Sequence, residues 1–197
     1  MKLLLASKSA TRRAMLEAAG VPFGCVEAAL DEEQAKAQLR ARGANAADLA
    51  IGLAEEKARS VAAPEGVLVL GSDQVLERHD GSMLDKPSSI EEAREQLLSL
   101  AGRTHRLHSA GVVIEDGRAV WWKTEQVELK MRPLGDAFLD GYLAAEYEAI
   151  RWSVGGYRIE GPGVQLFDRV NGSHFAILGL PLLPLLAYLR ERGLILS

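Results

Sequence analysis

The uninterrupted apolar run Val67–Leu70 constrains the fold of this chain more than any other feature. A strand that faces water on one side alternates apolar and polar residues, whereas a continuous apolar run is typical of a strand covered on both faces. A second such run, Leu3–Ala6, opens the chain, and a segment of helical composition follows it. We therefore predict a sheet with buried strands and helices packed on its faces.

Strand-like and helix-like segments alternate along the rest of the sequence. Hydrophobic spacing predicts strands at about 2–6, 23–26, 67–70, 105–114, 118–130 and 164–170, and helices at about 10–19, 45–62, 91–100, 134–147 and 182–192. Asp116-Gly117 lies between two of these strands and is a strong hairpin signal. The charged stretch 31–38 is compatible with a loop or a short helix. Because one hairpin sits among crossover units, we expect an α/β or α+β fold with a mixed, twisted sheet and flanking helices.

Composition excludes several classes of protein. The chain of 197 residues carries a net charge of -4, which argues against general nucleic-acid binding, where a basic face supplies the affinity. The longest apolar run, 175–189, is shorter than the roughly 20 residues that a membrane-spanning helix needs, and we predict that it is a buried strand end followed by the start of a core helix. No targeting segment is evident. Cys25 is the single cysteine, so no internal disulfide can form, and its apolar neighbours predict that it is buried.

A short polar segment after the opening strand combines hydroxyl groups with positive charge. Ser7 and Ser9 supply hydroxyl groups, and Lys8, Arg12 and Arg13 supply cations, where a helix is predicted to begin. The first turn of a helix presents backbone N–H groups and the positive end of the helix dipole. These parts suit a phosphate-bearing ligand, although a serine cap with a solvated arginine pair accounts for the same residues.

A second polar segment, 71–74, follows the buried run Val67–Leu70 and includes Asp73. Ligands of α/β proteins bind outside the carboxyl ends of strands, so we expect Asp73 to hold a divalent metal or orient a water there. A turn or capping role is the alternative. Taken singly, Lys57, Lys86 and Glu32 are ordinary surface residues. As a set, however, cations and carboxylates are the parts that triphosphate chemistry needs.

Several ordered motifs make the chain resemble the Maf family of nucleoside triphosphate pyrophosphatases over nearly its full length. The family opening Leu-Ala-Ser-x-Ser-x-x-Arg corresponds to residues 5–12, and the Leu-Ala-x-x-Lys-Ala helix to 53–58. Further matches are Gly71-Ser72-Asp73-Gln74, Lys86-Pro87, the segment 99–105, Thr124, Gly161 and Leu178-Gly179-Leu180-Pro181.

This resemblance implies a fold, an activity and a setting. It implies a single Maf-like domain over 1–197, of the Maf/ITPase-like type, with two lobes around a central cleft. It implies hydrolysis of the α–β phosphoanhydride of a nucleoside triphosphate to a nucleoside monophosphate and pyrophosphate, with Mg²⁺ or Mn²⁺ as cofactor. It also implies a cytoplasmic protein and, as is common in the family, a homodimer, while the charge and the length of the apolar run leave neither nucleic acid nor membrane as a partner.

The same resemblance assigns roles to individual residues. Asp73 is expected to be the general base or water-orienting carboxylate, and Glu32 to join it as a metal ligand. The triphosphate is expected to be bound by Ser7, Arg12, Lys57 and Lys86. Such an arrangement matches anhydride hydrolysis, which needs charge neutralisation and an aligned water.

Three positions bear on which base is accepted, namely Thr11, Gln74 and Glu160. Family members acting on dTTP and UTP have Arg, Thr and Gln at these places, whereas the branch acting on 7-methyl-GTP shares Asp-Gln and Glu-Gly with this chain. A glutamate carboxylate accepts from guanine N1–H and N2–H₂ and favours a base made cationic by methylation. We therefore predict 7-methyl-GTP as substrate. The alternatives are dTTP or UTP, or a nucleotide-binding regulator of cell division with little turnover.

Overall fold

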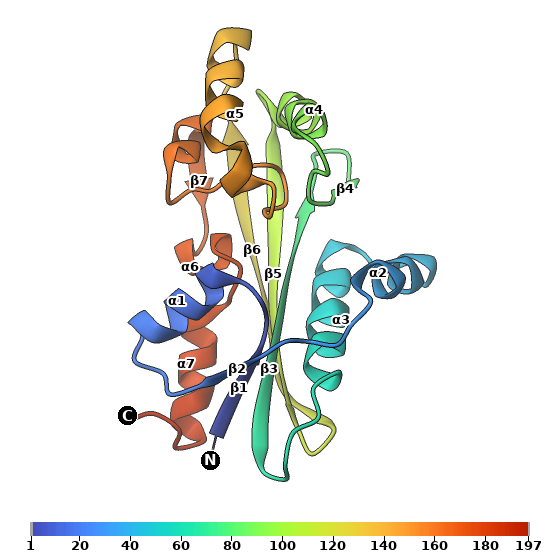
Figure 1. Ribbon diagram of the computed structural model, residues 1–197, viewed down its shortest axis with the longest axis vertical. Coiled ribbons are helices and arrows are strands. Elements are labelled where there is room, and N and C mark those ends of the chain that lie inside the picture. Colours follow the sequence, from blue (N-terminus) through green and yellow to red (C-terminus); the bar gives the residue numbers. More distant parts are fainter. Residues whose placement is uncertain (1, 197) are drawn as a thin grey trace. The chain divides into compact units, whose positions relative to one another are not determined.

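A computed structural model describes residues 2–196 and contains a seven-stranded mixed sheet flanked by helices, as predicted (Figure 1). The strands run in the order β2-β1-β3-β5-β6-β7, with β4 paired to β3. β1 is parallel to both β2 and β3, whereas β4 and β7 are antiparallel to β3 and β6. Their bounds are β1 Lys2–Ala6, β2 Gly24–Val26, β3 Val67–Glu77, β4 Met83–Leu84, β5 Thr104–Glu115, β6 Arg118–Met131 and β7 Phe167–Asn171.

Polar caps set the starts of most helices. The side chains of Ser9, Asp31, Asn45 and Ser89 each accept from the backbone N–H three residues further on, which satisfies a donor that the helix itself leaves open. The Asp31 cap explains why the charged stretch 31–38 is helical. The helices are α1 Ala10–Ala18, α2 Glu32–Ala41, α3 Ala46–Arg59, α4 Ile90–Leu100, α5 Asp136–Ile150, α6 His174–Ile177 and α7 Leu182–Glu191, with a 3-10 helix η1 at Pro162–Leu166.

The chain divides into two compact units, as the resemblance implies, while the cleft stays a prediction. The first unit comprises the chain up to Gln74, His108–Glu125 and the chain from Ser173 onward, and the second comprises Val75–Leu107 and Gln126–Gly172. Whether 1–197 is a single Maf-like domain likewise stays a prediction.

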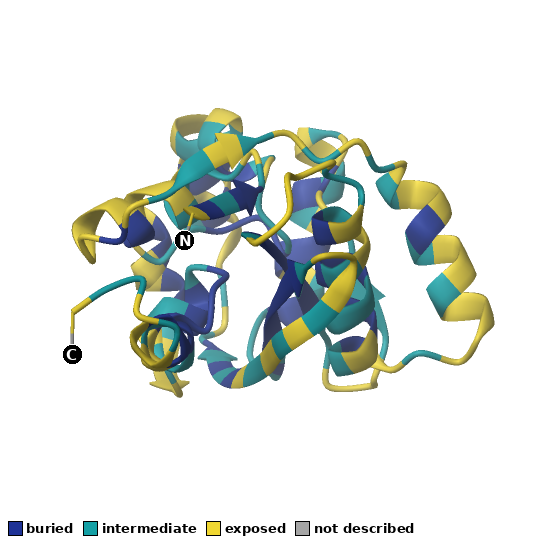
Figure 2. Ribbon diagram, turned by 90° about the horizontal axis from the view of Figure 1, so that it is seen from below, coloured by how far each residue is buried: buried dark blue, intermediate teal, exposed yellow. Residues whose placement is uncertain are grey.

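Each unit has its own apolar interior. In the first unit, α1 and α7 bury Leu16, Leu185 and Leu189 together with Leu5 and Leu70 of the sheet. α3 buries one apolar face, which includes Leu49, Leu53 and Ala58, whereas α2 is mostly exposed and buries only Ala35 (Figure 2). In the second unit, α4 and α5 pack against each other, and the buried residues include Leu97, Leu100, Leu139, Leu143 and Leu129.

The prediction that a strand ends at Leu70 is wrong, because β3 continues to Glu77. A Cβ on Gly71 would meet the backbone of α3 at Ala54 and Ala58, so the missing side chain is what lets the helix lie on the strand here. Asp73 therefore lies within a paired, buried strand and not in a loop beyond it.

Three further predictions are corrected by the structure. Pro162 opens a 3-10 turn in the segment predicted as strand 164–170, so only Phe167–Asn171 is strand. The apolar run 175–189 begins as the short helix α6, because Ser173 caps it by accepting from Ala176 N–H. Cys25 is exposed, since β2 is a three-residue strand at the edge of the sheet.

Candidate active site

Side-chain alternation along β3 sends neighbouring polar residues to opposite faces of the sheet. Asp73 points toward α3, where it contacts Lys57, whereas Ser72 and Gln74 point the other way, toward the segment 176–179. Ser72 and Asp73 are both buried, and Gln74 is half-buried. The candidate site in the first unit is therefore built on both sides of one strand.

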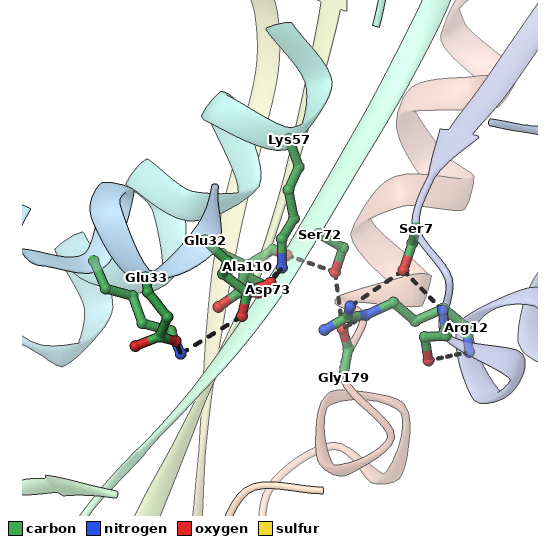
Figure 3. A network of polar contacts seen from close by, with 11 residues as sticks. Ser7, Arg12, Glu32, Glu33, Lys57, Ser72, Asp73, Ala110 and Gly179 are labelled. Atoms are coloured by element: carbon green, nitrogen blue, oxygen red, sulfur yellow. Dashed lines mark hydrogen bonds and ion pairs between the residues drawn. The ribbon is translucent and has the colours of Figure 1, made fainter. Parts of the chain in front are cut away.

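On the α3 side, one lysine contacts two carboxylates. The Lys57 ammonium contacts Asp73 Oδ1 and lies 2.9 Å from Glu32 Oε2. Asp73 comes from β3 and Glu32 from the capped first turn of α2, as Figure 3 shows. The Lys57 and Asp73 side chains are only 12% and 9% exposed. Charged groups so far removed from water need partners of opposite charge, and in this cluster the lysine and the two carboxylates are partners of one another.

On the other side, Arg12 is held by neutral acceptors. Its Nε donates to the Gly179 carbonyl oxygen at 2.8 Å, and its Nη1 donates to Ser7 Oγ at 3.4 Å (Figure 3). Burial lowers the pKa of the Arg12 guanidinium, while the negative charges of Asp73 and Glu32 raise it. Arg12 therefore lies within electrostatic reach of the carboxylates that contact Lys57.

The predicted hydroxyl cluster at the start of α1 is partly used within the chain. Ser9 donates its backbone N–H to Ser7 Oγ at 3.2 Å, and its own hydroxyl accepts from Arg12 N–H at 3.3 Å. The N–H groups of Ala10 and Thr11 lie in the first turn, where the helix supplies no acceptor. The start of α1 thus places two backbone N–H groups next to the Arg12 guanidinium.

Gln74 uses its amide group to support α6. Its Nε2 donates to Ser109 Oγ at 2.8 Å and to the carbonyl oxygens of Ala176 and Ile177 at 2.9 Å each. Ser109 Oγ also donates to the Ala176 carbonyl at 2.5 Å. Gln74, which is predicted to be a specificity residue, is therefore hydrogen-bonded to the segment that follows Ser173.

Two of the predicted site residues belong to the second unit. Lys86 is exposed on the loop between β4 and α4, next to the buried Pro87. Glu160 is exposed in the turn before η1. The other seven, including half-buried Thr11, belong to the first unit, where the structure brings Lys57, Asp73 and Glu32 into direct contact.

Within residues 2–196, no group of three or more His, Cys, Asp and Glu side chains is arranged to hold a metal ion. Asp73 and Glu32 are nevertheless two oxygen donors gathered around one ammonium. Mg²⁺ is usually bound through one or two carboxylates together with substrate phosphates and waters. The donor set therefore fits a divalent cation that arrives with a phosphorylated ligand.

Sequence reasoning missed two residues of this site. Ser72 donates to the carbonyl oxygens of Ala110 and Gly179, at 2.8 and 2.9 Å, and Gly179 also accepts from Arg12. A period-two pattern continued through β3 would have placed Ser72 opposite Asp73. Nothing in the sequence spacing indicates the contact between Gly179 and Arg12, which lie 167 residues apart.

Comparison with known proteins gives full-length matches. Residues 2–192 match the family model described as Maf-like protein. The nucleoside triphosphate pyrophosphatase of Sphingopyxis alaskensis is 50% identical, covering 98% of each chain, and that of Caulobacter vibrioides is 48% identical, covering 96% of this chain and 94% of the relative. The 7-methyl-GTP pyrophosphatase of Rhizobium meliloti is 46% identical, covering 98% of this chain and 97% of the relative.

Proposed function

Since the chain belongs to the Maf family, we propose that it is a hydrolase that cleaves the α–β phosphoanhydride of nucleoside triphosphates. The observation that carries this proposal is the contact of Lys57 with Asp73 and Glu32 in the first unit, with Arg12 in electrostatic reach. Two cations and two carboxylates gathered in one place are suited to phosphoanhydride hydrolysis, where positioning and charge stabilisation supply most of the catalysis.

In this proposal, Asp73 orients the attacking water and accepts its proton. The water oxygen forms a bond to the α-phosphorus, and the bond from that phosphorus to the bridging oxygen breaks. The products are a nucleoside monophosphate and pyrophosphate. The contact with Lys57 holds the Asp73 carboxylate in a fixed position on β3.

The triphosphate is bound by cations and hydroxyl groups. Arg12 and Lys57 neutralise phosphate oxygens, and the Ser7 hydroxyl donates a further hydrogen bond. The backbone N–H groups of Ala10 and Thr11, at the start of α1, also donate hydrogen bonds to the triphosphate. The family motif adds Lys86, which lies in the second unit.

Asp73 and Glu32 would hold a divalent cation, Mg²⁺ or Mn²⁺, because both are oxygen donors that converge on one ammonium. When bound, such an ion supplies Lewis-acid polarisation of the phosphate oxygens. A dependence of activity on added metal, abolished by chelation, is the expected consequence.

Among nucleotides, we propose 7-methyl-GTP as the preferred substrate. Glu160 is exposed, and its carboxylate can accept from guanine N1–H and N2–H₂ while its charge favours a methylated, cationic base. Gln74 contributes to base selection indirectly, because its amide group donates hydrogen bonds to the backbone of α6 and so fixes the position of that helix. Thr11 lies next to Arg12 on α1. The similarity to the Rhizobium meliloti protein supports the same choice.

The remaining proposals concern the setting of the protein. The substrate is the expected partner, together with a second copy of the chain in a homodimer in the cytoplasm. We propose that 1–197 acts as a single Maf-like domain. Among the described residues, no helix combines the length and apolarity needed to cross a membrane.

A pyrophosphate-release screen tests this function. The purified protein is incubated with 7-methyl-GTP, GTP, dTTP, UTP, CTP or pseudo-UTP, with Mg²⁺, Mn²⁺ or a chelator. Selective, metal-dependent release from 7-methyl-GTP supports both the activity and the choice of base. A preference for dTTP or UTP keeps the activity and refutes the choice of base. Binding without turnover of any nucleotide refutes the activity and favours a regulatory protein.

A further inference from the structure

The turn after α6 contains a backbone carbonyl that accepts hydrogen bonds from side chains of two distant elements. The Gly179 carbonyl oxygen accepts from Arg12 Nε at 2.8 Å and from Ser72 Oγ at 2.9 Å. Arg12 belongs to α1, and Ser72 to the buried strand β3. Gly179 therefore connects the guanidinium to the strand that bears Asp73.

Gly179 also provides the space in which the guanidinium lies. A Cβ at this position would meet Arg12 Nη2 at 3.2 Å and Nε at 3.3 Å, which is tighter than ordinary contact. The residue has a φ of +96°, a conformation that residues with a side chain rarely adopt. Both the backbone conformation and the packing of Arg12 thus depend on the missing side chain.

We propose that Gly179 is a positioning residue for phosphate binding, which it serves by fixing the Arg12 guanidinium. The proposal rests on the function above, in which Arg12 binds the triphosphate. With Nε bound to Gly179, the terminal nitrogens keep a set direction in which their fork can meet phosphate oxygens. A side chain held in this way before binding also loses less conformational entropy when the phosphate arrives.

Substitutions at Gly179, Gly193, Arg12 and Ser72 test this role. Gly179→Ala is expected to raise KM and the dissociation constant of inorganic triphosphate by about tenfold, as expected for loss of a fixed charge-assisted hydrogen bond. Gly193→Ala is the matched control, because Gly193 has a φ of +66° and no atom within 4 Å of an added Cβ. Gly193→Ala also places a side chain at a positive φ, but away from Arg12, and should leave KM unchanged.

The Arg12→Lys background separates a positioning role from a structural one. A lysine cannot donate to Gly179 through Nε, so adding Gly179→Ala should then change KM by less than about twofold. The same tenfold loss in both backgrounds would overturn the proposal. If Gly179→Ala does not fold, Ser72→Ala weakens the support of the same carbonyl, and a KM increase of about threefold is expected only when Arg12 is present.

Triphosphate binding separates this inference from the function on which it rests. If the wild-type protein binds inorganic triphosphate in a Gly179-dependent way but hydrolyses no nucleotide, the positioning role stands and the proposed activity fails. If nucleotides are hydrolysed but Gly179→Ala acts equally in both backgrounds, the activity stands and the positioning role fails. A wild-type protein that neither binds nor hydrolyses overturns both.

Discussion

Replacing Gly71 by alanine should separate α3 from β3 and thereby disturb the pairing of Lys57 with Asp73. A Cβ built on Gly71 would lie 1.9 Å from the Ala54 carbonyl oxygen and 2.9 Å from the Ala58 nitrogen. These two atoms are the acceptor and donor positions of one helical turn. The added methyl group would therefore press on the helix backbone in the last turn of α3.

The size of the effect follows from these distances. An ordinary carbon–oxygen contact is about 3.3 Å, so α3 must retreat by about 1.4 Å or its hydrogen bond must break. Overpacking of this kind costs about 3 kcal/mol, or roughly 6–12 °C in Tm for a chain of this size. Because Lys57 moves with α3, misplacement by about 1 Å should also lower kcat/KM by about 100-fold.

Thermal unfolding and pyrophosphate release measure the two effects. Gly141→Ala is the control, since Gly141 lies inside α5 with no atom within 4 Å of an added Cβ, and it should gain about 0.5–1 kcal/mol. If Gly71→Ala unfolds at the wild-type temperature and keeps wild-type kcat/KM, the reasoning about the α3–β3 contact is refuted.

Three further predictions concern chemistry, selectivity and pH. Asp73→Asn should abolish pyrophosphate release while leaving nucleotide binding, measured by calorimetry, within a few-fold of wild type; retained turnover would exclude Asp73 as the base. Glu160→Gln should shift the ranking of kcat/KM away from guanine nucleotides, and an unchanged ranking would remove Glu160 from base selection. Burial lowers the pKa of His105 from 6.5 to about 4, so the unfolded chain takes up this proton first as the pH falls. The free energy of unfolding should therefore drop by about 2 kcal/mol between pH 7 and 5, and His105→Gln should lack this part of the drop in urea titrations at each pH.

The local sequence predicted an element correctly where the residues that begin or end it are part of the same segment. α3 lies within the predicted helix 45–62, where it begins after the Asn45 cap and ends at Arg59, three residues before the predicted limit. The hairpin turn is formed by Asp116 and Gly117, which both have positive φ, and this is the conformation that an Asp-Gly pair favours. In these places a few adjacent residues determine both the element and its limit.

The local sequence did not predict the structure where buried polar residues are paired with residues far away in the sequence. The apolar run stops at Leu70, yet β3 continues because Lys57 pairs with Asp73 and Gly179 accepts from Ser72. Neither partner is near in sequence, so no window around the strand could show that these polar residues are buried. The spacing of residues in the sequence likewise could not predict the contact between Glu32 and Lys57. The resemblance supplied the list of site residues, whereas the structure supplied the contacts among those in the first unit.

Lys57 and Arg12, the two cations of the first unit that are proposed to bind phosphate, differ in how the protein holds them. Lys57 contacts two carboxylates, whereas the bonds that Arg12 makes to side chains and carbonyls within residues 2–196 go to neutral acceptors. Burial without a directly bonded anion disfavours the charged guanidinium, as its lowered pKa indicates, and a bound phosphate would offset that cost. We propose that Arg12, whose direct partners are neutral, meets the phosphate before Lys57 does. In the proposed reaction, a divalent cation held by Asp73 and Glu32 would take over the pairing that Lys57 provides here, and Lys57 would then be able to bind phosphate.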